Sequence, residues 1–513
     1  MGAENNAKLN IPVKTFRRSP NLRALLPAVF AAVTFFLYAP VSMYLGNAEE
    51  FVLTLGSMWP VPAVCFPLAS LLLFLPARFL PGRAGKAFRA FLFAAGLLVY
   101  LQGNFLFEDI GVLGGLPYIM EEHKSRIIIN CALWLLVILI SIVLSLRNGD
   151  FDRVGGVFSG IFTVFILLST GILLLTAKGE YLRPRDSFVS DRGLYEASAV
   201  GDVIVIVPDM FDREYMDRIL DETPEISESL RNFTYYAGVK GCYGSTRESI
   251  PAFLSDENTV ELVGSVAASF QDSADSEPPS ADGGASACAY IYTDGRFISE
   301  TLSNLAGNLV SGTVGVRSYT ELAAVLYRLV ACQYAPDIFR EYVWLTGGEF
   351  DELCVPAADD AGIEAYIEEV SLYSTSNTGF FYSLVDKGIT AVSSPSFRLI
   401  HLYGAHYPYI HDAYLNPINP SYTEDNAVKA ARGSLLVISR YLEELRAAGA
   451  YDSSLIVIMA DHGYTVPGEL RDPLLMIKEP GKSGPFKVEY GTLLQDEIPA
   501  LVNSLYSDSR ISK

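Results

Sequence analysis

The sequence predicts a bundle of five transmembrane helices, followed by an α/β domain with a mostly parallel sheet flanked by helices. The first observation is a series of five long apolar segments before residue 177. The second is a set of three short, fully apolar runs beyond residue 200, separated by stretches with helical patterns. Such runs are typical of strands that are buried on both faces, in sheets covered by helices on each side.

The five apolar segments are residues 24–45, 58–77, 90–107, 127–146 and 154–176. Each approaches the roughly 20 apolar residues that a helix needs to cross a bilayer. Buried helices of a soluble core are the alternative, and five nearly uncharged segments in succession disfavour it. We therefore assign residues 1–176 to a transmembrane domain.

The distribution of basic residues predicts the orientation of this domain. Lys and Arg cluster before the first segment and in the second and fourth loops, whereas the first loop carries Glu49 and Glu50 and no base. The positive-inside rule therefore places the N-terminus in the cytoplasm. After five crossings the rest of the chain lies outside, so the sequence predicts a multi-pass protein of the cell membrane with an extracytoplasmic domain.

Charge and cysteine content limit the functions of that outer domain. The net charge of −20 argues against nucleic-acid binding, which usually needs a basic patch. Disulfides are permitted outside the cytoplasm, and the sequence leaves their pairing open. The cysteines in question are Cys242, Cys288, Cys332 and Cys354.

The outer domain is expected to span residues 201–513, after a connector at 177–200. Its apolar runs at 203–207 and 455–460 predict strands, and the stretch "FRLIHLYGAHYPYI" (397–410) contains a third such run. Helical patterns cover 317–345 and 426–449, and residues 271–287 read as a low-complexity loop. Strands that alternate with helices in this way predict the parallel α/β sheet.

Polar side chains follow the strands where each one ends. Asp209 comes after the first run, His406 after the second, and Asp461-His462 after the third. Thr246 lies where a helix is expected to begin, a position that favours an alkoxide or a phosphate. Because ligands of such sheets bind beyond the carboxyl ends of the strands, these residues predict a divalent metal site with its own nucleophile.

Each of these residues also has a structural explanation. Either aspartate could cap a helix, Thr246 could be an N-cap, and the histidines could bind nearby backbone groups. We expect His401, inside its strand, and His411, which looks exposed, to be structural. A functional role for these residues is favoured only because polar side chains follow the end of all three predicted strands.

The motifs resemble the alkaline-phosphatase/sulfatase superfamily, in particular the membrane-anchored lipoteichoic acid synthase and phosphoethanolamine transferase branch. The segments that carry the resemblance are the five helices, "VIVIVPDMFD", "GCYGSTRESIPAFLS", "HLYGAHYPY" and "YDSSLIVIMADHG". The resemblance implies one Mn²⁺ or Zn²⁺ ion held by Asp209, the nucleophile Thr246, Asp461 and His462. It also implies that His406 contacts the substrate phosphate.

The chain departs from this family at several positions. Asp209 stands where the family usually has Glu, and Ala252 replaces a cysteine of the phosphoethanolamine transferases. No histidine follows His462, which implies a single metal ion, and Phe253 replaces the arginine of the sulfatase motif.

The resemblance implies a phospho-group transferase of the glycerol phosphate or phosphoethanolamine type that modifies an envelope polymer or glycan. The donor would be a membrane phospholipid, and the polymer or glycan would be the acceptor. Two alternatives remain: a hydrolase of phospho- or sulfo-esters, and a degenerate relative that binds lipid as a sensor.

Overall fold

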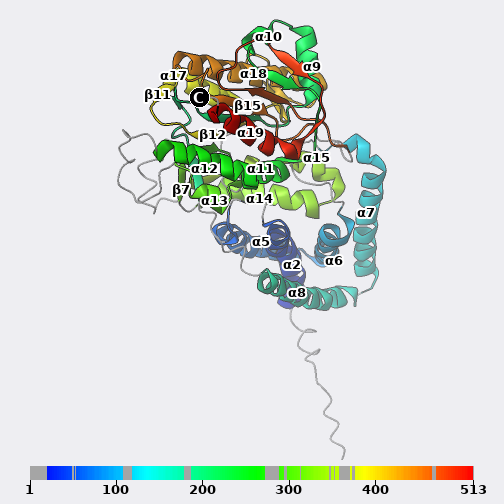
Figure 1. The fold of residues 1–513 in the computed structure, drawn as a ribbon. Coiled ribbons are helices and arrows are strands. Elements are labelled where there is room, and N and C mark those ends of the chain that lie inside the picture. Colours follow the sequence, from blue (N-terminus) through cyan, green and yellow to red (C-terminus); the bar gives the residue numbers. More distant parts are fainter. Residues whose placement is uncertain are drawn as a thin grey trace, which may run out of the picture. The chain divides into compact units, whose positions relative to one another are not determined.

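The structure is a computed structural model. It describes residues 20–48, 51, 53–107, 118, 120–148, 150–177, 187–271, 288–293, 297–311, 314–345, 348–351, 353–356, 370–371, 376–464 and 469–511. The chain divides into two compact units (Figure 1). The membrane unit contains Met1–Arg185 and Val314–Ala357, and the sheet unit contains Asp186–Thr313 and Ala358–Lys513.

Five helices in the described part of the membrane unit are long and apolar enough to span a bilayer, as predicted. They are Pro20–Gly46, Leu55–Phe79, Gly82–Leu106, Lys124–Arg147 and Phe151–Thr176. The elements that form them are α2 (Pro20–Val33), η1 (Thr34–Tyr38), α3 (Ala39–Gly46), α4 (Leu55–Met58), α5 (Pro60–Phe79), α6 (Gly82–Leu101), η3 (Gln102–Leu106), α7 (Lys124–Arg147) and α8 (Phe151–Thr176), with η4 (Met120–His123) before α7. Many of their leucines and isoleucines are exposed, as expected of surfaces that face lipid.

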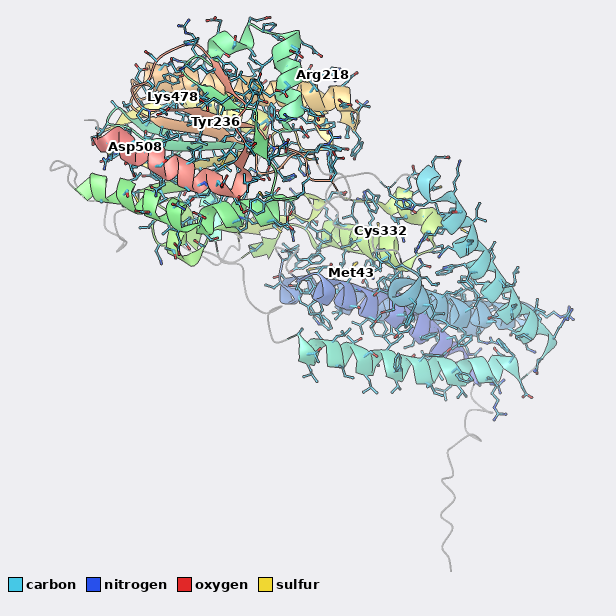
Figure 2. All side chains as sticks on the ribbon, turned by 45° about the vertical axis from the view of Figure 1, so that its right-hand side comes forward. Met43, Arg218, Tyr236, Cys332, Lys478 and Asp508 are labelled. Carbon is cyan, nitrogen blue, oxygen red and sulfur yellow. The ribbon has the colours of Figure 1, made fainter. Side chains whose placement is uncertain are left out.

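The membrane unit also contains a segment from the middle of the predicted outer domain. Its elements are β8 (Val314–Val316), α14 (Tyr319–Tyr334), η7 (Asp337–Phe339), α15 (Arg340–Val343), α16 (Gly348–Asp351) and β9 (Cys354–Pro356). Figure 2 shows α14, which carries Cys332, beside α3, which carries Met43. The sequence predicts helices here, but it places them in the 201–513 domain, whereas the contacts group them with the spanning helices.

The sheet unit is built on a seven-stranded sheet with the order β17-β4-β16-β15-β3-β12-β6. Its strands are β17 (Lys487–Glu489), β4 (Thr234–Tyr236), β16 (Leu475–Lys478), β15 (Leu455–Met459), β3 (Val203–Pro208), β12 (Phe397–Leu402) and β6 (Ala289–Tyr292). The central strands β15, β3, β12 and β6 run parallel, and only the pairs that β16 makes are antiparallel. The predicted strands and the fold class are therefore confirmed.

Helices cover both faces of this sheet. They are α9 (Arg213–Glu222), α10 (Ile226–Ser229), α11 (Thr246–Ser255), α12 (Glu257–Gln271), α13 (Glu300–Ser303), α17 (Asn377–Lys387), α18 (Glu424–Ala447), η8 (Gln495–Glu497) and α19 (Ile498–Ile511). Successive side chains of β3 point to opposite faces. Ile204 and Ile206 join the core under α17 and α18, while Val205 and Val207 join the core under α11, α12 and α19 (Figure 1). The strand is apolar throughout because both of its faces are buried.

Short strands complete the sheet unit. They are β1 (Ser187–Ser190), β2 (Glu196–Ser198), β5 (Val239–Lys240), β7 (Leu309–Ser311), β10 (Val370–Ser371), β11 (Thr390–Val392), β13 (Tyr409–His411), β14 (Pro417–Ser421) and β18 (Leu493–Leu494). The predicted connector thus becomes two strands from Ser187 onward, and its residues 178–186 lie outside the described residues. Residues 1–19 and 272–287 also lie outside them. The six cysteines all lie among the described residues, and no disulfide joins any of them there.

A buried ion pair lies at the end of the sheet where β3 and β12 begin. Arg398 Nη1 lies 2.9 Å from Asp202 Oδ2, and both side chains are fully buried. Asp202 also accepts the backbone N–H groups of Ser198 and Ser396, at 2.7 and 2.8 Å. These contacts join two segments that are distant in the sequence, residues 198–202 and 396–398.

We expect Arg398→Met to destabilise the sheet unit by about 3–5 kcal/mol, because it leaves the Asp202 carboxylate buried without its cation. Thermal unfolding of the detergent-solubilised protein measures the loss. Arg218→Met is the matched control, since Arg218 pairs with Glu222 and Asp425 at the surface (Figure 2), where such pairs contribute about 0–1 kcal/mol. Equal losses in the two variants would contradict the prediction.

Candidate metal centre and active site

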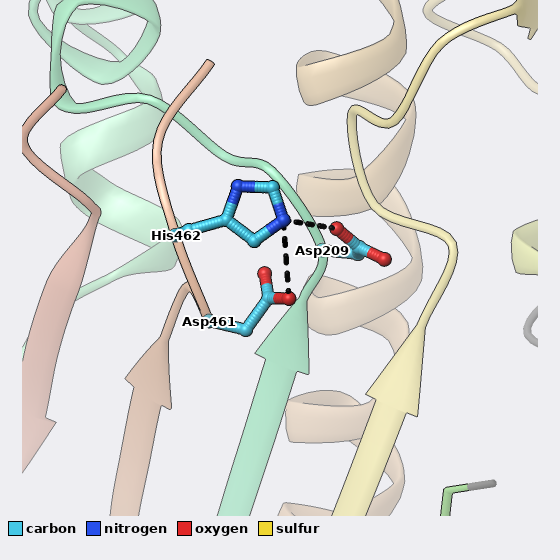
Figure 3. Close-up of side chains that lie close together, drawn as sticks. All are labelled: Asp209, Asp461 and His462. Carbon is cyan, nitrogen blue, oxygen red and sulfur yellow. Dashed lines mark ion pairs between the residues drawn. The ribbon is translucent and has the colours of Figure 1, made fainter. Parts of the chain in front are cut away.

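Two acidic residues of the candidate site lie level with one another on neighbouring strands. β15 and β3 are parallel, and Ile458 pairs with Ile206. Asp461 and Asp209 each follow three residues later, so both carboxylates emerge at the carboxyl edge of the sheet (Figure 3). The register of the sheet therefore produces the juxtaposition that the sequence predicts.

The side chains at this edge lie within a few ångströms of each other. His462 Nε2 is 3.6 Å from Asp209 Oδ1 and 3.5 Å from Asp461 Oδ2 (Figure 3). Thr246, the first residue of α11, places its Oγ1 3.4 Å from Asp209 Oδ2 and 3.5 Å from His462 Nε2. The structure thus brings together the four residues predicted to hold a metal ion.

The spacing of these atoms fits a divalent cation better than direct hydrogen bonds. Asp209 Oδ1 and Asp461 Oδ2 are buried and have no hydrogen-bond partner among the described residues. Ligand atoms about 2.1 Å from a tetrahedral centre lie about 3.4 Å apart, close to the separations seen here. Asp209, Asp461 and His462 offer ligand atoms that all lie within 4.8 Å of one another. Two carboxylates, an imidazole and a hydroxyl are also suitable donors for Zn²⁺ or Mn²⁺.

The electrostatics of the site favour a bound cation. Burial raises the pKa of Asp209, but nearby histidines outweigh this effect and hold that pKa below its ordinary value. These histidines are His406, His401 and His462. Burial and the charge of Asp209 raise the pKa of Asp461. Burial opposes protonation of His462, yet the two carboxylates raise its pKa. A bound cation would relieve the repulsion between the carboxylates.

Backbone contacts orient the side chains of the candidate metal site. Met210 donates its N–H to Asp461 Oδ1 at 3.0 Å. With Nδ1 protonated, His462 donates to the Gly463 carbonyl at 2.7 Å, which leaves Nε2 as the ligand atom facing both carboxylates. Metal-ligating histidines commonly have this arrangement.

Gln495 is a site residue that the sequence does not reveal. It is buried at the start of η8, and its Oε1 accepts the Cys242 N–H at 3.0 Å. Its Nε2 donates to the Asp461 carbonyl, so one amide joins the loop before Thr246 to a residue of the candidate metal site. No motif or spacing marks this position, because its role depends on a contact between distant segments.

His401 is predicted to be structural, but the structure places it beside the site. Its Nε2 lies 3.6 Å from Asp209 Oδ2, and its Nδ1 lies 3.1 Å from Thr293 Oγ1. The pairing of β12 with β3 sets His401 opposite Val207, two residues before Asp209. A polar residue near the end of a strand next to β3 was the signal that could have identified it.

His406 lies on the loop after β12 and is half-buried. Its Nδ1 is in contact with the carbonyl of Tyr407, which leaves Nε2 for exchange of a proton. Its ring packs against the rings of Tyr403 and Tyr407, with centroids 5.6 and 4.9 Å away. Its charge acts on Asp209, which is consistent with the predicted position near the substrate phosphate.

A buried amide supports the backbone behind Asp209. Asn377 accepts the N–H of Gly404 and donates to its carbonyl, both at 3.0 Å, and also contacts His411 Nε2 at 3.0 Å. Gly404 has a φ of +66°, and a Cβ there would lie 2.2 Å from the Asp209 carbonyl oxygen. His411 is buried, not exposed as predicted, and its role in this network is structural.

Several solved structures are similar to this chain. They include i-CgsB in complex with k-i-k-neocarrahexaose (14% identity, TM-score 0.35, 60% of this chain and 72% of that chain). A second is an integral membrane lipooligosaccharide phosphoethanolamine transferase A from Neisseria meningitidis (12% identity, TM-score 0.30, 94% of this chain and 95% of that chain). A third is the lipoteichoic acid synthase LtaP from Listeria monocytogenes (12% identity, TM-score 0.28, 63% of this chain and 76% of that chain). No family model matches the chain, and no curated protein matches its sequence. Similarities this low carry no argument for function, which depends on the site itself.

We expect Gly404→Ala to weaken Mn²⁺ binding at least tenfold, because the new methyl group would displace the backbone of Asp209. Isothermal titration calorimetry measures the affinity, and thermal unfolding measures the stability. Gly449→Ala is the control: Gly449 also has a positive φ, of +73°, but nothing lies within 4 Å of its Cβ position. That variant pays only the strain of about 1–2 kcal/mol. Equal Mn²⁺ affinities in the two variants would refute the steric argument.

His411 predicts a pH dependence of stability. Burial lowers the pKa of His411 from its ordinary value of 6.5. The unfolded chain therefore binds a proton here more readily than the folded one, and stability falls as the pH drops below about 6.5. We expect His411→Gln to lose less stability than the wild type between pH 7.5 and pH 5.5, as measured by the unfolding temperature. An equal loss in both proteins would contradict this role.

Proposed function

We propose that this protein is a metal-dependent phosphoester transferase with Thr246 as its nucleophile. One observation carries the proposal: the Thr246 hydroxyl lies 3.4 Å from Asp209 Oδ2 and 3.5 Å from His462 Nε2, at the first residue of a helix. A hydroxyl in this place serves both as a metal ligand and as an attacking group. The resemblance of the motifs to the lipoteichoic acid synthase and phosphoethanolamine transferase branch supports the same assignment.

One divalent ion, Mn²⁺ or Zn²⁺, would be held by Asp209, Asp461, His462 and Thr246, and when bound it would lower the pKa of the hydroxyl. The N-terminus of α11 adds a favourable field for the negative oxygen and for the phosphate. Asp209 is one methylene shorter than the usual glutamate, yet both of its oxygens come within 3.4–3.6 Å of the other ligand atoms. The shorter side chain is therefore compatible with the site.

The reaction has two balanced steps. Thr246 Oγ1, having already lost its proton to solvent, attacks phosphorus; the bond from phosphorus to the leaving oxygen breaks, and that oxygen takes a proton from His406. In the second step His406 takes the proton of the acceptor hydroxyl, whose oxygen attacks the phosphothreonine; the bond from phosphorus to Thr246 Oγ1 breaks, and Thr246 leaves with its oxygen ionised, as at the start. His406 would thus act as acid and then as base, and it would orient the phosphate.

The donor we propose is a membrane phospholipid, which leaves as diacylglycerol, and the acceptor is a hydroxyl of an envelope polymer or glycan. The five spanning helices support a donor drawn from the bilayer, since the sheet unit is covalently joined to them. The positive-inside pattern supports a cytoplasmic N-terminus and a sheet unit on the outer face. Water as the acceptor would make the protein a hydrolase, and loss of turnover with retained lipid binding would make it a sensor.

We expect Thr246→Ala to lower diacylglycerol release from labelled phosphatidylglycerol or phosphatidylethanolamine at least 10³-fold, with Mn²⁺ present. EDTA should abolish release by the wild type. Thr246→Ser should keep measurable turnover, because it retains a hydroxyl at the same atom, and Ser245→Ala should remain near wild type. Mass spectrometry of the quenched reaction should find the phosphoryl group on Thr246. Full turnover by Thr246→Ala would contradict the proposal.

A further inference from the structure

The segment Val314–Pro356 interrupts the sequence of the sheet unit, yet it belongs to the membrane unit. Its neighbours along the chain, at residues 313 and 358, are in the sheet unit. The segment must therefore lie on the same side of the membrane as the sheet unit, whichever side that is. What it does there does not depend on the proposed transferase reaction.

A buried polar cluster fixes one end of this segment to the spanning helices. The Asp337 carboxylate accepts from Arg340 Nη2 at 2.8 Å, Gln102 Nε2 at 3.0 Å and Arg126 Nε at 3.1 Å. The Asp337 N–H also donates to Asn130 Oδ1 at 3.1 Å. Gln102 belongs to η3, and Arg126 and Asn130 belong to the first part of α7, so Asp337 lies at the ends of two spans.

Further contacts hold α14 against the spanning helices. The Tyr327 hydroxyl donates to the Phe36 carbonyl at 3.0 Å, and Gln333 Nε2 donates to the Gly103 carbonyl at 2.9 Å. The Tyr334 ring packs on Gly103, where a Cβ would lie 2.1 Å from the ring. Since these partners are parts of spanning helices, α14 is held against those helices from Tyr327 to Tyr334.

Three apolar side chains next to Asp337 remain exposed. The exposed fractions are 41% for Ile338, 53% for Phe339 and 78% for Tyr342. Residues three and four apart share one face of a helical turn, so these three side chains point the same way. The charged neighbour Arg340 is buried instead, with its guanidinium 5.0 Å from the Phe107 ring and 5.1 Å from the Tyr118 ring.

This apolar face continues the lipid-facing surface of the spans. Ile128 and Ile129, next to Asn130, are 68% and 70% exposed, and Phe105, beside the residues that bind Asp337, is 71% exposed. Exposed apolar and aromatic groups at the ends of spanning helices belong at the boundary between headgroups and acyl chains. We propose that Ile338, Phe339 and Tyr342 form a membrane contact that inserts into the lipid leaflet facing the sheet unit.

The test is photochemical crosslinking of the full-length protein in phosphatidylglycerol–phosphatidylcholine nanodiscs. The photoreactive amino acid p-benzoylphenylalanine is placed at Phe339 and, in a second variant, at Tyr342. The control position is Tyr382 of α17, which is 63% exposed in the sheet unit. Mass spectrometry of the peptides then measures the yield of phospholipid adduct at each position.

We expect at least ten times more phospholipid adduct at Phe339 and at Tyr342 than at Tyr382. Yields within twofold of the control at both positions would overturn the proposal. Adducts mainly with a second copy of the chain, or with another protein, would also overturn it and assign the face to a protein interface. Because the crosslink requires no turnover, this result is independent of the outcome for Thr246.

Discussion

Two carboxylates lie side by side in a buried place because β3 and β15 are parallel neighbours in register. Such a pair cannot stay ionised together without compensation. Other groups at this edge of the sheet compensate the negative charge. They are His462 between the carboxylates, His401 and His406 near Asp209, and the helix N-terminus that carries Thr246. The candidate chemistry is therefore a consequence of strand order combined with the position of two aspartates.

Buried charged groups at the two ends of this sheet have different partners. At the end where the strands begin, Asp202 is matched by Arg398 and by two backbone N–H groups, and Lys478 is bound by three carbonyl oxygens. At the end where they finish, Asp209 and Asp461 lie beside each other and beside histidines, with no Arg or Lys ion pair to either among the described residues. Buried polar groups are normally satisfied, and exceptions mark places where something else binds. The carboxylates at the carboxyl edge thus lack the cationic side chain that Asp202 has, which supports this edge as the candidate site.

Local patterns in the sequence predicted most of the fold. Length and apolarity identified the five spans, and short apolar runs identified β3, β12 and β15. The residues that end those strands were predictable too, because strand direction alone brings Asp209, Asp461 and His462 to one edge. Gln495 and Asn377 were not predictable, since each acts through backbone groups of distant segments. The placement of Val314–Ala357 in the membrane unit was not predictable for the same reason. Its helices look amphipathic, and only the contacts that Asp337 and Tyr327 make show where these helices pack.

The division of the chain has a practical meaning. Because Val314–Ala357 returns to the membrane unit, the sheet unit is joined to it by three covalent links and not by one, at residues 185–186, 313–314 and 357–358. A single proteolytic cut at the first link would leave the two units attached. A fragment starting at residue 201 would carry Asp337 and the apolar faces of α14 without the helices that cover them, and so would tend to aggregate. Isolating a soluble sheet unit therefore requires removing an internal segment as well as the N-terminal helices.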